Sequence, residues 1–368
     1  MGFSEFFGNE KIVAALRGGL RAGRVPHALL FTGPRGVGKF TLARMFAQAA
    51  NCERSTDDFC GECAACRQIS QLAEPEKLTE QGLAERGESA DAATVERVPL
   101  ILQSHPDVWA LVPDPVRLKN PVARPMLRIG QLRAVRRAAY FEPIGRRRVF
   151  ILDGAETMRS DVANVFLKIL EEPPGSATLL LTAPSPFSLL PTILSRCMQF
   201  HFAPLSVDEV ETILRARSRR KPAEAKLAAQ LAEGSPGVAL GLDLEAAVEQ
   251  RNTALRILER AARGQGFAQL FRDTAALAKD RESSFEELLG VFYGLLSDLL
   301  EINAGLRSPL LRNPHLAKEL EALSKLVDSG WIARALVGID QWAAGARRNL
   351  NRQLGLDSLA LSLARENG

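Results

Sequence analysis

The stretch His27-Ala-Leu-Leu-Phe-Thr32-Gly33-Pro-Arg-Gly-Val-Gly38-Lys39-Phe40-Thr41 decides the fold of this chain. Its first six residues form a short apolar run that predicts a buried strand, and a helical pattern runs from 38 to 50. Glycines at such a junction let backbone N–H groups turn onto phosphate oxygens, and the helix N-terminus adds partial positive charge. We therefore expect a phosphate loop whose nucleotide-binding residues are Gly33, Gly36, Gly38 and Lys39.

The position after the lysine departs from a hydrolysing phosphate loop. It normally carries Ser or Thr, whose hydroxyl coordinates Mg²⁺, and here it is Phe40. Thr41 comes one residue late and points about 100° away on a helix, although it stays a candidate nucleotide-binding residue. The phosphate cradle is present without its metal ligand, so the sequence leaves ATP binding open.

Three further apolar runs, at 108–112, 148–153 and 177–182, predict three more strands. Continuous apolar strands separated by helical patterns indicate an α/β fold with a parallel sheet and helices on both faces.

Asp153 ends the third of these four strands, where a phosphate-loop ATPase holds Mg²⁺; the alternative is a strand-end turn or a helix N-cap. A hydrolysing enzyme of this class has glutamate next, as the base that acts on the attacking water. Gly154 follows here, and Glu156 would need an unusual backbone path to take that role. Two catalytic positions are missing, so we do not expect the chain to hydrolyse ATP by itself.

The composition is that of a globular protein with two or three domains. The chain has 368 residues, of which 46% are hydrophobic and 24% charged, and its net charge is +4. This charge is compatible with a partner near DNA but too small to indicate nucleic-acid binding. No run of about 18 apolar residues and no secretory pattern at the N-terminus occur, so we expect no membrane span and a cytoplasmic protein.

Four of the five cysteines are crowded into 15 residues with the spacing C-x7-C-x2-C-x2-C. Four thiolates close a tetrahedral Zn²⁺ site, which is structural because no position stays open for water. A [4Fe–4S] cluster also uses four cysteines, but nothing else in the sequence indicates redox chemistry. We therefore predict structural zinc held by Cys52, Cys60, Cys63 and Cys66, with Cys197 as a small packed residue.

The rest of the chain divides by composition. Residues 72–104 are rich in Glu, Ala, Thr, Gln and Gly, which predicts a solvent-exposed insertion with at most a loose helix. Short helical patterns fill 204–243, and everything from 244 to 368 reads as helix. A stripe at three- and four-residue steps indicates burial in a core or a subunit interface; it comprises Leu288, Leu289, Phe292, Leu295, Leu296, Leu299 and Leu300.

Several segments in this order resemble the delta-prime subunits of bacterial DNA polymerase III clamp loaders, which are AAA+ proteins. The segments are 23–31 (GRVPHALLF), 60–66 (CGECAAC), 105–107 (HPD), 166–174 (FLKILEEPP), 195–197 (SRC) and 234–237 (GSPG). The helical C-terminal third matches in architecture only.

The resemblance implies three domains and a role in a ring of five subunits. The domains would be an AAA+ core over 1–203, with a zinc module at about 52–66 and the insertion at about 72–104, a helical lid over 204–243 and an all-helical collar over 244–368. The partners would be gamma/tau-type and delta subunits, the sliding clamp and primed DNA, within a DNA-directed DNA polymerase holoenzyme. In gamma/tau subunits a lid arginine contacts nucleotide, whereas the matching loop here has Pro236 and Gly237.

Arg196 is the candidate catalytic residue, acting in trans. In the family that the chain resembles, this arginine reaches ATP bound by a neighbouring subunit. A guanidinium there neutralises charge that develops on the transferred phosphoryl group, and such arginines raise rates about 10³–10⁵-fold in related nucleotidases. From the sequence alone, a surface arginine is the alternative.

Arginines at 133, 136 and 137 share one helix face, followed by three more at 146–148. They indicate a DNA-phosphate contact or a solvated face, and we favour the solvated face because no aromatic platform is interleaved with them. Two other functions stay open: an autonomous AAA+ ATPase that acts on DNA or a protein partner, and a zinc-containing nucleic-acid-binding module.

Overall fold

The computed structural model describes residues 2–87, 92–115, 125–173, 175–279, 285–306, 311–346 and 351–365. Pro174 of the FLKILEEPP segment and residues 88–91 of the expected insertion lie outside them. The chain forms two compact units, Met1–Ile213 with Gly234–Val238 and Leu214–Glu233 with Ala239–Gly368. Each unit takes part of 204–243, so the three-domain division with a separate lid stays a prediction.

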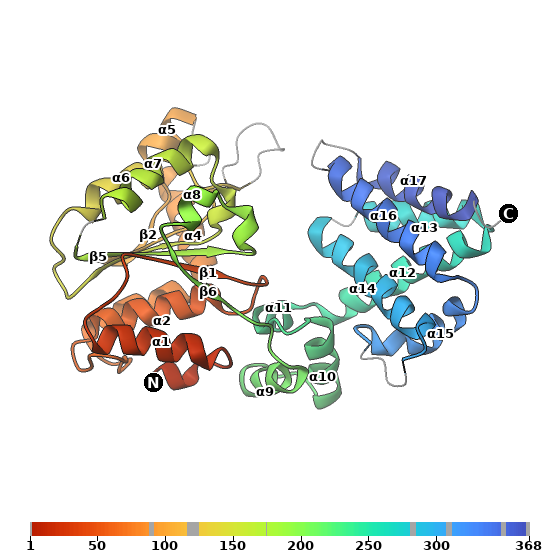
Figure 1. The fold of residues 1–368 in the computed structure, drawn as a ribbon, viewed down its shortest axis with the longest axis horizontal. Helices are drawn as coiled ribbons and strands as arrows, with labels where there is room; N and C mark the ends of the chain where they lie inside the picture. Colours follow the sequence, from red (N-terminus) through yellow and green to blue (C-terminus); the bar gives the residue numbers. More distant parts are fainter. Residues whose placement is uncertain are drawn as a thin grey trace. The chain divides into compact units, whose positions relative to one another are not determined.

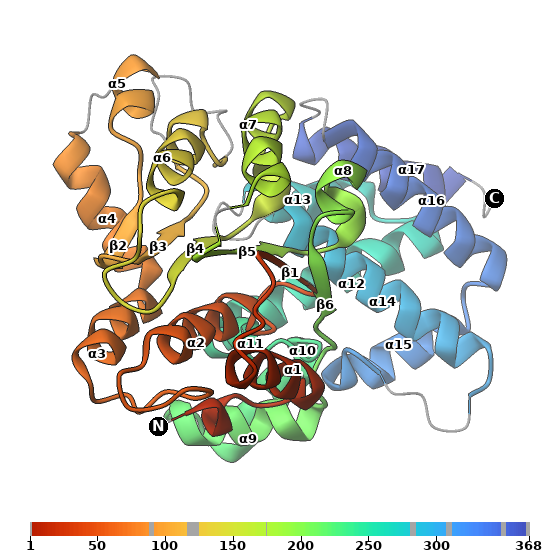
Figure 2. The ribbon, with the colours of Figure 1, turned by 60° about the vertical axis from the view of Figure 1, so that its left-hand side comes forward.

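The first unit contains a six-stranded sheet in the order β2-β3-β4-β5-β1-β6 (Figures 1 and 2). Every pair except one is parallel; β2 runs antiparallel to β3. The strands are β1 (Ala28–Thr32), β2 (Leu102–His105), β3 (Val108–Leu111), β4 (Arg148–Leu152), β5 (Ala177–Ala183) and β6 (Met198–His201).

The four predicted strands are confirmed as β1, β3, β4 and β5. The expected parallel pairing of these four strands is confirmed, and β2, at one edge of the sheet, adds an antiparallel strand. The sequence did not predict β2 or β6, since both are four residues long and carry polar side chains, with β6 largely exposed. Short, partly polar strands are typical of sheet edges.

Helices cover both faces of this sheet, as expected. One face carries α1 (Glu10–Arg21) and α2 (Lys39–Asn51), and the other carries α6 (Ile129–Ala139) and α7 (Ser160–Glu171) (Figure 1). Side chains of β1, β4 and β5 are buried along their whole length. The shorter elements are η1 (Phe3–Glu5), α3 (Ala64–Ser70), η2 (Gln71–Ala73), α4 (Pro75–Arg86), α5 (Ala92–Arg97), η3 (Ala155–Thr157), η4 (Pro186–Ser188) and α8 (Pro191–Leu194).

The 72–104 segment is less exposed than its composition suggests. No apolar residue of helix α4 is buried, but Leu100 is buried and its carbonyl oxygen accepts a hydrogen bond from Gln131 Nε2 at 2.7 Å. Arg86 lies 2.8 Å from Asp114, and both side chains are almost fully buried. The prediction of a solvent-exposed insertion is therefore corrected, because a few buried apolar residues and a buried charged pair attach this polar segment to the rest of the first unit.

Asp107 of the HPD segment is a buried structural carboxylate. Its Oδ1 accepts hydrogen bonds from the N–H of Ile144 and from Arg148 Nη2, at 3.1 and 2.9 Å, and its Oδ2 accepts from the N–H of Gly145 at 2.6 Å. Burial alone would raise the pKa of Asp107, but these donors together hold it below its ordinary value. The carboxylate joins the start of β3 to the turn before β4.

The second unit is helical. Helices α9 (Val207–Arg217) and α11 (Pro236–Gly241) have residues in both units, and one hydrophobic cluster joins the long helices of the second. The predicted stripe lies on α14: five of its seven residues are buried, Leu289 is partly buried and Leu300 is 44% exposed. The stripe is therefore core. The other helical elements are α10 (Pro222–Leu231), α12 (Leu244–Arg263), α13 (Phe267–Lys279), α14 (Phe285–Asn303), η5 (Pro314–Leu316), α15 (Ala317–Ser324), α16 (Ser329–Ala346) and α17 (Arg352–Arg365).

The Asp107→Ala substitution should destabilise the first unit by about 3–5 kcal/mol, because it leaves the Arg148 guanidinium buried without its carboxylate. Urea unfolding followed by circular dichroism measures this loss. The folded-state pKa of Asp107 is lowered, so its contribution is complete above its ordinary pKa and disappears as the pH falls through the folded value. The difference from the unsubstituted chain should therefore shrink below about pH 4. As a control, Asp161→Ala removes an exposed partner of Arg159 and should cost less than about 1 kcal/mol.

Candidate functional site

The phosphate loop has the predicted place between β1 and α2. Gly33, Gly36 and Gly38 have φ values of 143°, 76° and 104°, where a side chain would be strained. A Cβ at Gly33 would also lie 2.6 Å from the carbonyl oxygen of Phe202. Lys39 is the first residue of α2, so its position at the helix N-terminus suits a phosphate-binding lysine.

Lys39 is held by its own loop. Its Nζ donates hydrogen bonds to the carbonyl oxygens of Gly33 and Pro34, both at 2.7 Å. Burial lowers the pKa of Lys39, while the charges of Asp153 and Glu156 oppose this shift. Phe40 and Thr41 follow on α2, where each step turns the side chain by about 100°, and nucleotide binding by Thr41 stays a prediction.

Two carboxyl groups face this lysine. Asp153 follows β4, and its Oδ1 accepts a hydrogen bond from Thr182 Oγ1 at 2.5 Å. Burial raises the pKa of Asp153 despite that bond and the charge of Lys39. Burial also raises the pKa of Glu156, and the negative charge of Asp153 adds to the shift. Both groups are therefore in electrostatic range of the phosphate loop.

Glu156 comes near Lys39 along an unusual backbone path, as the sequence indicated that it would have to. Gly154 adopts a left-handed conformation, with φ 67° and ψ 47°, and the short helix η3 follows it. This turn supplies the unusual backbone path that Glu156 needs to come near Lys39. Among the described residues, Glu156 Oε2 is buried and has no hydrogen-bond partner. A glycine directly after Asp153 is the signal that could have predicted the turn.

The loop is covered by two other segments of the first unit. The N–H of Gly237 donates to the carbonyl oxygen of Gly36 at 2.8 Å, and a Cβ at Gly36 would lie 2.8 Å from the backbone nitrogen of Val238. On the other side, the Phe6 ring would lie 3.0 Å from a Cβ at Gly38. The GSPG segment thus packs directly on the phosphate loop, without an arginine.

Arg196 follows α8 and is anchored at both terminal nitrogens. Its Nη1 donates to the carbonyl oxygen of Thr192 at 3.0 Å, and its Nη2 lies 3.1 Å from Oε1 of Glu171 on α7. About a third of the Arg196 side chain is exposed. The guanidinium is therefore presented on the surface in a defined position.

Arg196 and the phosphate loop lie at opposite ends of parallel strands. Met198, two residues after Arg196, pairs with Leu29 of β1, and the phosphate loop begins at Gly33, four residues further along that strand. At about 3.3 Å per residue, this separation is about 13 Å. The strand register thus keeps Arg196 away from the phosphate loop of its own chain.

The four predicted metal ligands come together. The Sγ atoms of Cys52, Cys60, Cys63 and Cys66 all lie within 4.8 Å of one another. A tetrahedral ion with metal–sulfur bonds of about 2.3 Å requires sulfur–sulfur distances of about 3.8 Å, so the group needs only small shifts to close around an ion. Cys52 caps the C-terminal end of α2, and Cys63 caps the N-terminal end of α3.

The thiol environments support metal binding. Hydrogen bonds from the N–H groups of Glu62 and Cys63 lower the pKa of Cys60 to about 6, whereas burial raises the pKa of Cys66. The charged thiolate of Cys60 is thus favoured even without a cation. Burial disfavours the thiolate of Cys66 unless a bound cation compensates its charge. Cys197 packs against the core, as expected, and burial raises its pKa to about 12.

The basic face of α6 is confirmed in part. Arg133, Arg136 and Arg137 are exposed, but Arg148 is buried against Asp107. No aromatic residue is interleaved with the arginines on this helix, as the sequence indicated. Tyr140 and Phe141 follow at its end and are 56% and 67% exposed.

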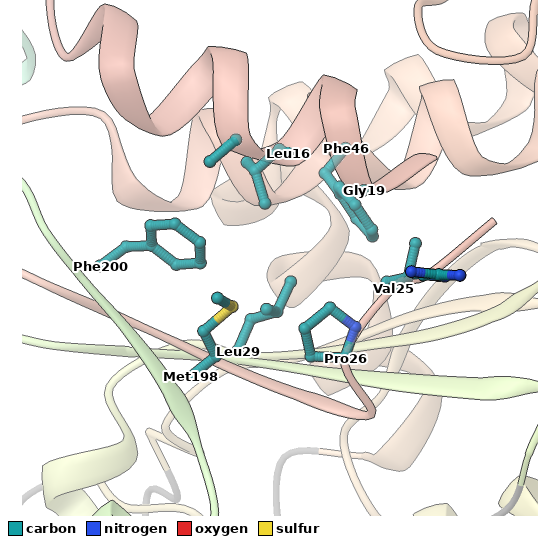
Figure 3. A pocket seen from close by; sticks show the side chains of 10 residues that line it. Leu16, Gly19, Val25, Pro26, Leu29, Phe46, Met198 and Phe200 are labelled. Carbon is teal, nitrogen blue, oxygen red and sulfur yellow. The ribbon is translucent and has the colours of Figure 1, made fainter. Parts of the chain in front are cut away.

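An apolar pocket of about 150 Å³ lies at the other end of β1 from the phosphate loop. Leu16 and Phe46 line it from α1 and α2, and Met198 and Phe200 line it from β6, with Pro26 just before β1 (Figure 3). Since nucleotide binds at the carboxyl ends of parallel strands, this pocket is not part of the phosphate site.

In the part of the chain that the structure describes, no helix has the length and apolar character needed to cross a bilayer.

Comparison with known families gives a match within the first unit. Residues 8–206 fit the sequence model of the family described as "DNA polymerase III, delta subunit".

Two curated relatives illustrate the similarity. The tau subunit of DNA polymerase III from Escherichia coli (strain K12) is 30% identical over 316 residues, which cover 79% of this chain and 43% of that protein. The gamma subunit from Buchnera aphidicola subsp. Acyrthosiphon pisum (strain APS) is 28% identical over 215 residues, covering 58% and 48%. The chain thus spans less than half the length of these relatives.

Solved structures show weaker likeness. A DNA polymerase III gamma subunit-related protein from Thermotoga maritima has a TM-score of 0.38 at 16% identity, covering 97% of this chain and 99% of that one. The RuvB Holliday junction branch migration motor of Thermotoga maritima has a TM-score of 0.39 at 17% identity, covering 86% and 89%. No functional inference follows from scores this low.

The Cys63→Ser substitution should abolish metal binding, since it removes one of four thiolate ligands. Mass spectrometry of the purified chain after removal of free metal should show about one bound ion in the unsubstituted protein and almost none in the variant. Cys197→Ser is the matched control and should keep the ion. A Cys63→Ser chain with its metal content unchanged would contradict the four-cysteine site.

Proposed function

Because the chain belongs to the family described as DNA polymerase III, delta subunit, we propose that it is a clamp-loader subunit that supplies Arg196 to ATP on a neighbouring subunit. Within a cytoplasmic ring it would contact gamma/tau-type and delta subunits and help to load the sliding clamp onto primed DNA. Its relatives named as tau and gamma subunits of DNA polymerase III support this placement.

The position of Arg196 is the observation that carries the proposal. An arginine finger must lie on the surface, away from its own nucleotide loop, and point toward a second protein. Arg196 meets the first two requirements, because the β1–β6 register separates it from Gly33 and a third of its side chain is exposed; the second protein is part of the proposal. On the neighbour, its planar guanidinium would form two hydrogen bonds to the γ-phosphate and stabilise the charge that develops during hydrolysis.

In this proposal the phosphate loop of this chain has a structural role in the ring and does not hydrolyse ATP. Phe40 replaces the magnesium-binding hydroxyl, Gly154 replaces the catalytic glutamate, and Gly237 packs on the loop. Asp153 would hold Mg²⁺ only with ATP bound through the loop residues. The chain would therefore act as a non-hydrolysing subunit.

Zinc is the metal we propose for the four cysteines. Zn²⁺ accepts four thiolates in a tetrahedral structural site, and the ion would then join the end of α2 to the start of α3. Such a link would fix the helix that begins with Lys39 at its opposite end.

Glu156 favours a second candidate function, an autonomous ATPase. A carboxylate near Lys39 and Asp153, with one oxygen, Oε2, that has no hydrogen-bond partner among the described residues, can accept a proton from water. In that case Glu156 would replace the missing glutamate at position 154.

The purified chain with ATP and Mg²⁺ should show no turnover above background, because the magnesium-binding hydroxyl is absent. Phosphate release measures this directly, and Lys39→Ala and Glu156→Gln should leave the background unchanged. Magnesium-dependent turnover that both substitutions abolish would instead establish the autonomous ATPase.

The Arg196→Ala substitution should slow ATP hydrolysis in a ring reconstituted with gamma/tau-type and delta subunits. At the one site served by this arginine, a loss of about 10³–10⁵-fold is expected. Steady-state turnover of the whole ring falls only partly, since the other sites keep their own arginines, so single-turnover kinetics should show one slow phase.

Ring assembly is the control for this experiment. Arg196 lies on the surface with an exposed partner, so the variant should fold and enter the ring as the unsubstituted chain does, as measured by light scattering after gel filtration. Normal turnover by a fully assembled Arg196→Ala ring would rule out the proposed role.

A further inference from the structure

Glu171 is the residue that fixes the direction of Arg196. It is the last residue of α7, and its Oε1 lies 3.1 Å from Arg196 Nη2. The carbonyl oxygen of Thr192, on α8, accepts from Nη1 at 3.0 Å. The guanidinium is therefore fastened to two helices, at its two terminal nitrogens.

These contacts leave part of the guanidinium available. A guanidinium has five N–H donors. In Arg196, Nη1 donates to Thr192 and more weakly to Ser195 at 3.4 Å, and one donor of Nη2 is used by Glu171. Among the described residues, no contact occupies the Nε–H or the second Nη2–H. Donors of this kind on a guanidinium can bind the oxygens of a phosphate.

The ion pair contributes little to stability. The Glu171 side chain is 52% exposed and that of Arg196 is 35% exposed. Exposed pairs of this kind add little to the folding free energy. A free arginine on the surface, by contrast, loses considerable rotamer freedom when a ligand orders it. The pair is therefore more useful for orientation than for folding.

We propose that Glu171 is a positioning residue for the trans arginine: it holds Arg196 so that the Nε–H and the free Nη2–H meet the neighbour's γ-phosphate. This inference rests on the proposed function. Glu171 touches neither the phosphate nor the water and acts only through Arg196. Pre-ordering the side chain lowers the entropy that is lost when the transition state forms.

The opposite role for the same contact is a latch, in which Glu171 withholds Arg196 from the phosphate. The donors without a contact favour positioning, because phosphate can bind to them while Nη2 keeps its contact with Glu171. Loss of the Glu171 carboxylate should slow ATP hydrolysis if Glu171 positions Arg196 and should speed it if Glu171 is a latch. One rate measurement therefore separates the two roles.

The experiment compares Glu171→Ala and Glu171→Gln in the reconstituted ring by single-turnover ATP hydrolysis. Glu171→Ala should slow the Arg196-dependent phase about two- to tenfold, as expected from one side chain losing its order, with KM for ATP unchanged. Glu171→Gln keeps an acceptor oxygen for Arg196 and should restore most of the rate. Asp161→Ala, which breaks another exposed pair on α7, should leave the rate unaltered.

The double variant Glu171→Ala/Arg196→Ala provides the decisive comparison. If Glu171 acts only through Arg196, the double variant should equal Arg196→Ala alone, a complete failure of additivity. A faster or unchanged rate in Glu171→Ala, or additive losses in the double variant, would overturn the positioning role and leave the proposed function standing. An Arg196→Ala variant with an unchanged rate of ATP hydrolysis would overturn both the positioning role and the proposed function.

Discussion

The parallel pairing of β1 with β6 is the constraint on which the functional geometry depends. In a parallel sheet all carboxyl ends lie at one edge, so the loop after β1 is placed at one side and the residues before β6 at the other. The phosphate loop and Arg196 belong to these two segments. Their separation is therefore a property of the backbone hydrogen bonds and would survive most side-chain changes.

Hydrogen bonds at the ends of the strands fix the conformations of the loops that follow or precede them. Asp107 accepts from two N–H groups of the turn before β4 and from the Arg148 side chain on β4, and Thr182 donates to Asp153 at the opposite end of the strands. Buried polar groups are costly when they lack partners, so each of these sets fixes a loop in one conformation. The loops that carry Asp153 and Glu156 are thus held by the same sheet that positions the phosphate loop.

Sequence reasoning found the parts of the fold that depend on local pattern. Continuous apolar runs predicted β1, β3, β4 and β5, and cysteine spacing predicted four sulfur atoms close enough for one ion. It missed β2 and β6, which are short and polar because they lie at edges. It gave an unusual backbone path only as a condition for Glu156, although the glycine at position 154 was a local signal for the left-handed turn that supplies this path. The Glu171–Arg196 contact joins residues 25 positions apart, and no local rule predicts it.

The contact between Gly36 and Gly237 has a consequence for protein engineering. A Cβ at Gly237 would lie 3.0 Å from the carbonyl oxygen of Gly36, and one at Gly36 would meet the backbone of Val238. Each glycine therefore leaves room for the other, and neither can be enlarged independently. Conversion of this chain into a hydrolysing subunit by placing a side chain at Gly237 would therefore require the phosphate loop to shift by a few tenths of an ångström. Such a redesign has to rebuild both segments together.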